Sequence, residues 1–254
     1  MLTRTFIHIQ GIGQKTEQKL WKRGIQTWQH FLRHPHVIFS EARDEMVRRE
    51  LESSIVHLED IRFFCDRLSS GEMWRVFEGF KGRAVYLDIE TSGGYQGIDE
   101  ITVIGLYDGH AVQTFVNGIN LDEFEVAIAQ YDLVITFNGT AFDLPLIRNS
   151  FPNISLPPAH IDLRFLSKRL GYTGGLKRIE KYLGLTRNPE IDGMDGYDAV
   201  MLWKAYQWED HSALDRLIKY NTADIVNLKP LMEMAYKEMK TSLLSLTGHR
   251  QVGP

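Results

Sequence analysis

AVYLDIE (residues 84–90) is a run of β-branched, aromatic and aliphatic residues, and it begins a series of three such runs. The next two are EITVIGLYDG (100–109) and AVQTFVNG (111–118), with short turns at Gly109 and Gly118. Runs of this composition, bounded by glycine turns, are typical of strands that pair with their sequence neighbours. We therefore predict three consecutive strands of an antiparallel meander.

The segments after this meander change from strands to helices. LDEFEVAIAQY (121–131) has the pattern of a helix, and DLVITFNG (132–139) that of a buried strand. Nearly all of the remainder is predicted to be helical, with a helix beginning at His160-Ile161-Asp162 and long amphipathic stretches at 195–208 and 211–240. This order predicts an α/β domain over residues 73–240, with a mixed sheet flanked by helices.

The segments before the meander predict a small all-helical N-terminal region. Residues 1–36 contain the turn Gly11-Ile12-Gly13 between two short helical patterns, and residues 37–72 form a helical connector. Within 41–70 one apolar stripe recurs at three- and four-residue steps. Its members are Val47, Leu51, Ile55, Leu58, Ile61, Cys65 and Leu68. Residues 241–254 are predicted to be a C-terminal tail.

The composition is that of a globular protein, because 43% of the 254 residues are hydrophobic and 24% are charged. A single cysteine, Cys65, excludes an internal disulfide framework and a cysteine-cluster metal site. We expect no membrane segment and a cytoplasmic location, since no apolar run approaches the ~20 residues of a bilayer span and no signal peptide is recognisable.

Positive charge is concentrated in two segments, although the net charge is −4. Residues 1–34 hold six Lys or Arg against one acid, and residues 163–188 hold seven against one. Positive patches on an otherwise acidic chain favour a substrate with a phosphate backbone. The alternative is that both segments are ordinary solvated helix faces.

Asp88 and Glu90 end the first predicted strand. Alternate residues of a strand point to the same face, so both carboxylates should project together while Ile89 points into the core. Two adjacent acids repel, and such a pair requires a cation or raised pKa values. The alternative is two solvent-facing acids at a strand end.

Two further acids follow in helical settings. Asp143 ends FNGTAFD (137–143) at the start of a predicted short helix, where an Asp is often only an N-cap. Tyr220 and Asp224 are four residues apart on the last long helix, so their side chains should lie on one face. Taken alone, this spacing is more often structural.

Taken in order, DIET, NGTAFD and YNTAD resemble the three exonuclease motifs of the DEDDy branch of the DnaQ-like, RNase-H-like superfamily. The second motif is similar to that of the exonuclease domains of family B DNA polymerases, and small stand-alone RNase-H-like proteins share it. Three ordered motifs over roughly 140 residues are far more specific than any one of them. The tyrosine marks the branch, because the sister branch has a His where this chain has Lys219.

Phosphodiester hydrolysis at neutral pH requires an activated water and a group that absorbs charge on the leaving oxygen. Two divalent cations about 4 Å apart supply both. Carboxylates favour Mg²⁺ or Mn²⁺. The resemblance implies that Asp88 bridges both ions, that Glu90 and Asp224 complete the water-activating ion's site, and that Asp143 serves the second ion through waters. It also implies that Tyr220 orients the attacking water.

Other residues are candidate nucleic-acid contacts. Thr91 and the glycines after it leave room for a terminal nucleotide, and Phe142 is either a stacking residue or a core aromatic. Asn138, in the same motif as Phe142, and Lys177, in the basic segment 163–188, are further candidate contacts. Asp162 is either a fifth acid near the site or a helix cap.

The N-terminal segment resembles a helix-hairpin-helix module. Gly11 and Gly13 would expose backbone N–H groups to a phosphate, and Lys15 would add sequence-independent attraction. Such modules also serve as pure packing or protein-contact units.

The sequence therefore predicts a metal-dependent 3′–5′ exonuclease, a hydrolase acting on single-stranded or frayed nucleic acid with a free 3′ end, with DNA slightly favoured. One alternative is a structure-specific endonuclease on the same fold. Another is a non-catalytic nucleic-acid-binding module.

Overall fold

The computed structural model describes residues 1–94 and 99–245, which form two compact units. The helical unit comprises Met1–Lys81 and the residues from Tyr236 onward, and the sheet unit comprises Gly82–Ala235. Residues 246–254 of the predicted tail lie outside the described residues, whereas its first residues, up to Ser245, are helical. The domain boundaries at 36, 72 and 240 stay predictions. No helix within the described ranges has both the length and the apolar character to cross a bilayer.

The helical unit consists of helices of 3 to 16 residues, and polar side chains cap the starts of α2, α3 and α4. The Thr27 hydroxyl accepts from the His30 N–H, and the Ser40 hydroxyl from the Arg43 N–H, so each satisfies one free backbone donor of a first turn. Its elements are η1 (Leu2–Arg4), α1 (Gln14–Lys22), α2 (Trp28–Leu32), α3 (Glu41–Val56), α4 (Ile61–Cys65), η2 (Ser70–Val76) and α5 (Phe77–Phe80). The short 3-10 helix η3 (Lys81–Arg83) follows.

The prediction of one continuous apolar stripe over 41–70 is wrong, because α3 ends at Val56 and α4 begins only at Ile61. Ile55 and Leu58 are 38% and 37% exposed, whereas Val47 and Leu51 are fully buried. Asp60 begins the second helix by accepting a hydrogen bond from the Arg62 N–H at 3.0 Å. A local cap therefore overrides the helical period that connects the two segments.

A buried ion network connects α1 to η2 within the helical unit. Arg75 is 1% exposed, and its guanidinium contacts Glu17 at 3.0 Å and Glu72 at 2.6 Å. The Glu17 carboxylate also accepts the backbone N–H of Phe6 at 2.7 Å. Burial raises the pKa of Glu17, and Arg75 opposes that rise. Residues about 60 positions apart are thus held by charge-assisted hydrogen bonds inside the unit.

The sheet unit contains a five-stranded mixed sheet in the order β3-β2-β1-β4-β5. Its strands are β1 (Ala84–Thr91), β2 (Ile101–Tyr107), β3 (Val112–Val116), β4 (Leu133–Thr136) and β5 (Ala159–Asp162). The first three pair antiparallel as the predicted meander, and β4 and β5 run parallel to β1. The predicted α/β fold class is confirmed.

The helix predicted to begin at His160 is wrong, because residues 159–162 form β5. Their side chains alternate between buried and half-buried, which is the period of a strand. Pairing with β4 supplies the backbone hydrogen bonds that a four-residue segment cannot make alone. Helix α8 (Leu163–Arg169) starts after Asp162, whose carboxylate caps it by accepting from the Arg164 N–H at 3.0 Å.

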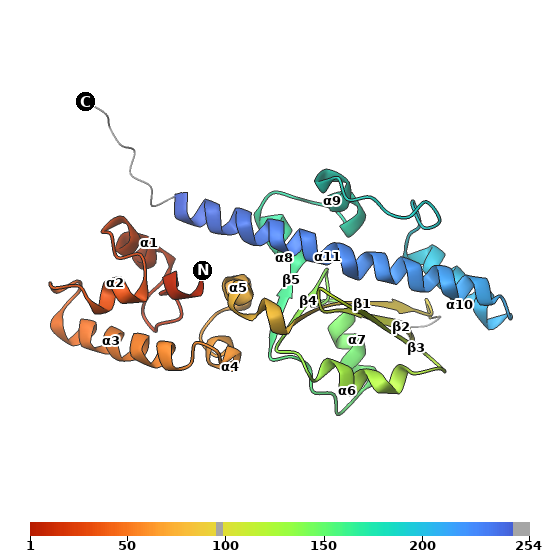
Figure 1. Cartoon of the computed structure of the whole chain (residues 1–254), viewed down its shortest axis with the longest axis horizontal. Helices are drawn as coiled ribbons and strands as arrows, with labels where there is room; N and C mark the ends of the chain where they lie inside the picture. The colour runs from red at the N-terminus through yellow and green to blue at the C-terminus, as the bar shows by residue number, and fades with distance from the viewer. Residues whose placement is uncertain (95–98, 246–254) are drawn as a thin grey trace. The chain divides into compact units, whose positions relative to one another are not determined.

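Helices cover both faces of the sheet (Figure 1). One face packs against η5 (Leu121–Glu123), α6 (Phe124–Ile128) and α7 (Asp143–Ser150). The other packs against α10 (Gly196–Gln207) and α11 (His211–Ser245), and α9 (Leu176–Leu183) precedes them in the chain. Val85, Leu87 and Ile89 of β1 point into the α6–α7 core. Because strand side chains alternate, Asp88 and Glu90 point to the face that α11 covers.

Candidate metal centre

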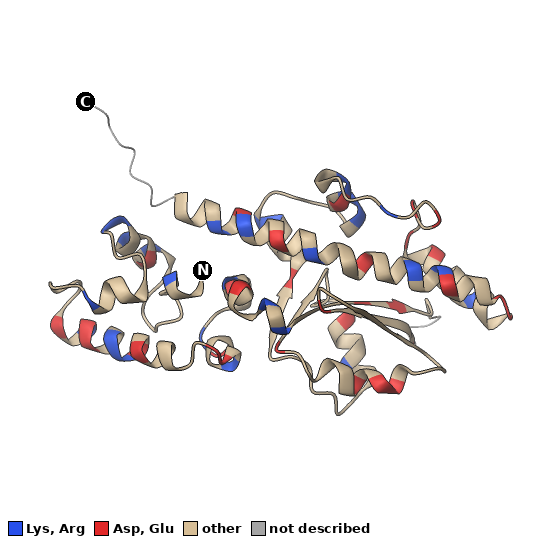
Figure 2. Cartoon of the chain, viewed as in Figure 1, with Lys and Arg blue, Asp and Glu red and all other residues tan. Residues whose placement is uncertain are grey.

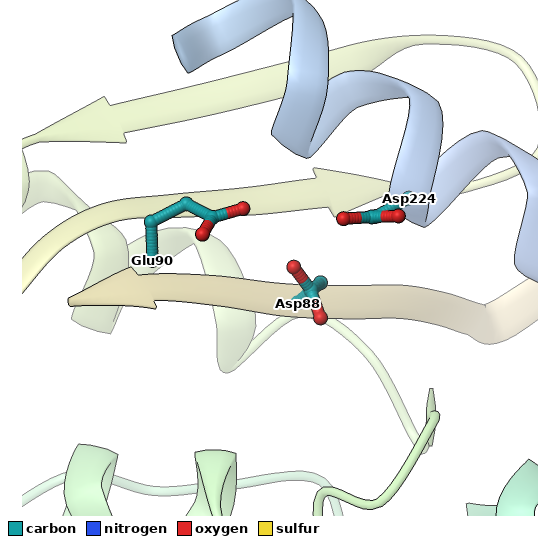
Figure 3. A group of neighbouring side chains, drawn as sticks. All are labelled: Asp88, Glu90 and Asp224. Atoms are coloured by element: carbon teal, nitrogen blue, oxygen red, sulfur yellow. The ribbon is translucent and has the colours of Figure 1, made fainter. Parts of the chain in front are cut away.

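Three acids meet between β1 and α11. Asp88 and Glu90 project from one face of β1, and Asp224 projects from α11 toward them (Figure 3). One carboxylate oxygen from each of the three lies within 4.8 Å of the others. Asp224 and Glu90 are 7% exposed, so the group is largely shielded from water.

Gly105 lets α11 approach the sheet closely enough to form this group. It lies opposite Asp88 in the β1–β2 register, and a Cβ atom there would be 2.0 Å from Asn221 Oδ1. The Asn221 amide donates to the Asp88 carbonyl at 3.3 Å and to Asp88 Oδ2 at 3.1 Å. Asn221 therefore ties α11 to the strand and orients the Asp88 carboxylate.

Asp143 is close to these acids without belonging to the group of three. It is the first residue of α7 and 2% exposed, and its Oδ1 accepts the Ile89 backbone N–H at 3.2 Å. The N-cap position is Phe142, and Asp143 makes no side-chain cap. Its negative charge still raises the pKa of Asp88.

The pKa values of all four acids are raised. Burial is the largest cause for each, and for Asp88 the charges of Asp224, Asp143 and Glu90 add to it. The pKa of Asp143 rises to about 7. The buried Glu90 Oε1 has no hydrogen-bond partner among the described residues. An all-oxygen donor set with clustered charge and an unused buried oxygen fits a hard divalent cation.

Tyr220 lies one helical turn before Asp224 and is 4% exposed. Its hydroxyl accepts a hydrogen bond from Lys177 of α9, whose Nζ lies 4.4 Å from the ring centroid. Burial raises the pKa of the phenol, and the charges of Asp224 and Glu90 raise it further. The phenol thus stays protonated at neutral pH, and its own O–H remains a donor.

Sequence reasoning missed two residues beside Asp224. The Arg187 guanidinium donates to Asp224 Oδ1 and is held by Glu180 at 2.6 and 2.8 Å. A signal was available in the sequence, because Glu180 is the one acid within the basic segment 163–188. The pKa of Arg187 is raised above its usual range by these carboxylates, which outweigh the effect of burial.

The remaining predicted contacts of this unit lie at the end of β1 and on the loop before α7. Thr91 is the half-buried last residue of β1, next to a break in register at Glu90. Asn138 has φ +73°, and its N–H donates to Asp162 Oδ1 at 2.9 Å. Asp162 is the N-cap of α8, and its charge also raises the pKa of Asp143. Phe142 is 44% exposed rather than a core residue.

Gly11, Gly13 and Lys15 belong to the helical unit. Gly11 has φ +81°, and its carbonyl accepts from Arg43 at 2.8 Å. Gly13 is the N-cap of α1, and Lys15 is exposed on its first turn. In the segment before this turn, where a short helical pattern was predicted, the one helix is the three-residue η1. Lys and Arg positions are frequent on α1 in this unit, and on α8 and α9 in the sheet unit (Figure 2).

The comparison with protein-family models agrees with this fold. Residues 85–236 match the model of the RNase_H superfamily, and the chain belongs to that superfamily. The comparison with curated protein sequences gives no match.

Among solved structures, the chain is similar to the family B DNA polymerase from the archaeon Pyrobaculum calidifontis, with 16% identity and a TM-score of 0.49 over 65% of this chain and 25% of the polymerase. It is similar to Escherichia coli RNase D, an exoribonuclease involved in structured RNA processing, with 18% identity and a TM-score of 0.43 over 70% and 48% of the two chains. It is also similar to Brucella melitensis NrnC, with 20% identity and a TM-score of 0.41 over 67% of this chain and 86% of NrnC. The chain thus spans a quarter of the polymerase and about half of RNase D.

Proposed function

We propose that this chain is a metal-dependent 3′–5′ exonuclease of the DEDDy type, which hydrolyses phosphodiester bonds of single-stranded or frayed nucleic acid, with DNA slightly favoured. The observation that carries the proposal is the convergence of Asp88, Glu90 and Asp224 within 4.8 Å on the buried face of an RNase-H-like sheet. Clustered buried carboxylates are costly to a fold, and groups with strongly raised pKa values concentrate at functional sites.

In this proposal two divalent cations, Mg²⁺ or Mn²⁺, would be held by the four acids, with Asp88 shared between them. Glu90 and Asp224 would complete the site of one cation, and Asp143 would serve the other through water. When bound, such cations activate water and stabilise charge on the leaving oxygen. The resting carboxylates repel one another, and that repulsion favours cation binding.

Tyr220 positions the attacking water. Its oxygen accepts from Lys177, which leaves the phenolic O–H free to donate toward the acids. A phenol with a raised pKa does not act as a base at neutral pH. Lys177 would therefore hold the phenol in place, and its charge would also attract a substrate phosphate.

The substrate contacts are proposed from exposure and charge. Phe142 is exposed enough to stack on a base. Thr91 is the last residue of β1, next to Glu90, and Asn138 lies on the loop that leads to Asp143. In the helical unit, Gly11, Gly13 and Lys15 would bind a backbone phosphate in the manner of a helix-hairpin-helix module.

Digestion of 5′-labelled single-stranded DNA, double-stranded DNA and RNA with Mg²⁺ or Mn²⁺ tests the proposal. We expect a ladder of products shortened from the 3′ end. Asp88→Asn and Asp224→Asn should abolish the ladder while binding of the oligonucleotide survives. The control is Asp122→Asn, which removes the charge of an exposed acid in η5 and should cleave as the wild type does.

Substrates with a blocked 3′ end separate the alternatives. Internal fragments from a blocked substrate would indicate an endonuclease on the same fold. Metal-independent binding without any cleavage would indicate a binding module. Full activity in Asp88→Asn would refute the assignment of the metal centre.

A further inference from the structure

Arg187 is a buried cation whose position is determined by Glu180. Its side chain is 4% exposed and that of Glu180 is 3% exposed. Arg187 Nε donates to Glu180 Oε2 at 2.8 Å, and Nη2 donates to Glu180 Oε1 at 2.6 Å. Asn227 of α11 donates to the same Glu180 Oε1 at 3.0 Å. The two-point contact is the strong, directional form of an arginine–carboxylate pair.

The same guanidinium also contacts one acid of the candidate metal centre. Nη2 donates to Asp224 Oδ1, while the buried Nη1 has no hydrogen-bond partner among the described residues. Arg187 therefore holds Asp224 with a nitrogen that it shares with Glu180, and it retains unused donors. Without its hydrogen bonds to Glu180, the guanidinium would have enough free donors to form further hydrogen bonds with the Asp224 carboxylate.

A divalent cation and a guanidinium compete for the same carboxylate. Because Glu180 neutralises Arg187, the pair adds no net charge to the acids of the site. If Glu180 were replaced by a neutral residue, the positive charge of Arg187 would stay buried in the site, and Asp224 would be its remaining carboxylate contact. Electrostatic attraction is strong where water is excluded, so this change would act directly on the cation's ligand.

We propose that the Glu180–Arg187 pair sets the affinity of the site for divalent cations. Glu180 restrains Arg187 so that it engages only one Asp224 oxygen, and the rest of that carboxylate remains available to a cation. This inference rests on the proposed metal centre. Glu180 and Arg187 are positioning residues, since neither is a member of the three-acid group.

Titration of the metal-free full chain with Mn²⁺, followed by calorimetry or by the electron paramagnetic resonance of free Mn²⁺, tests the inference without any substrate. We expect Glu180→Gln to weaken Mn²⁺ binding roughly 10- to 100-fold, the range seen when residues that orient metal ligands are changed. Glu180→Asp keeps the charge and should recover most of the affinity.

The double variant Glu180→Gln/Arg187→Gln distinguishes competition from simple loss of structure. It removes both charges together, so no unpaired charge from this pair is left buried and folding is protected. With the competing cation absent, its Mn²⁺ affinity should return to within about threefold of the wild type. An unchanged affinity in Glu180→Gln, or a double variant or a Glu180→Asp variant as weak as Glu180→Gln, would overturn the inference.

Two reference variants complete the design. Glu190→Gln makes the same chemical change in an exposed pair, with Lys219 at 2.6 Å, and should bind Mn²⁺ as the wild type does. Asp88→Asn reports on the metal centre itself. If the wild type binds no Mn²⁺, or Asp88→Asn binds it equally well, the proposed function fails. If Asp88→Asn loses binding while Glu180→Gln keeps it, only the present inference fails.

Discussion

Gly105→Ala tests whether close contact between β2 and α11 builds the acid cluster. The added Cβ would lie 2.0 Å from Asn221 Oδ1 and 3.0 Å from Ile225 Cδ1. Both side chains are buried, at 1% and 0% exposure, so neither has free space to move into. Asn221 can move only by giving up its hydrogen bonds to Asp88.

The cost follows from these distances. Inserting a methyl group into a packed interface costs about 1–3 kcal/mol. With a urea m-value of about 2 kcal/mol/M, the unfolding midpoint should fall by roughly 0.5–1.5 M. Because Asn221 orients Asp88, the variant should also bind Mn²⁺ more weakly than the wild type.

Urea unfolding of the metal-free chain, monitored by circular dichroism, is the assay. Gly196→Ala is the matched control, since nothing lies within 4 Å of a Cβ at that first position of α10. It should leave stability unchanged or raise it by about 0.4–1 kcal/mol. In an Asn221→Ala background the cost of Gly105→Ala should shrink, because the nearest clashing atom is gone. A Gly105→Ala variant that unfolds at the wild-type midpoint would refute the reasoning.

Three further predictions concern buried charge. Arg75→Met removes the cation between Glu17 and Glu72 and should cost about 3–5 kcal/mol in urea unfolding, whereas Lys81→Met in an exposed pair should cost under about 1 kcal/mol. Burial is the chief cause that lowers the pKa of His8 from 6.5 to about 4, so the unfolded chain binds more protons than the folded chain in this range. The free energy of unfolding should therefore fall by ~3 kcal/mol as pH drops from 6.5 to 4. His8→Gln should flatten that slope, and a variant as steep as the wild type would contradict it. The raised pKa values at the acid cluster mean that the metal-free fold loses stability as pH rises above the ordinary carboxylate range. The stabilisation by Mn²⁺ should therefore grow from pH 5 to pH 8 in thermal unfolding, and a pH-independent stabilisation would count against the metal centre.

Much of the sheet unit could be predicted from local patterns. The alternation in AVYLDIE directs Ile89 into the core and Asp88 and Glu90 to the other face, and the glycine turns predict the meander that follows. The order of elements predicts the mixed α/β fold, which is confirmed. The sequence predicted that Asp88, Glu90, Asp143 and Asp224 converge. The structure brings oxygens of Asp88, Glu90 and Asp224 within 4.8 Å and leaves Asp143 outside that group, while the roles of all four stay predictions.

Local patterns failed where a distant segment decides the conformation. Residues 159–162 become a strand because β4 supplies their hydrogen-bond partners. The helix over 41–70 is interrupted at Asp60, where a cap competes with the apolar period.

What the sequence by itself determined is periodic: which side chains of a strand or a helix share a face, because successive residues repeat at fixed angles. What only the tertiary structure decided is which faces meet and which charges are shared. The pairing of Glu180 with Arg187, the contact of Arg187 with Asp224, and the close approach of Asn221 to Gly105 join segments that no local period relates. Such contacts depend on how helices pack on the sheet, where one buried guanidinium or one missing Cβ decides the geometry of the site.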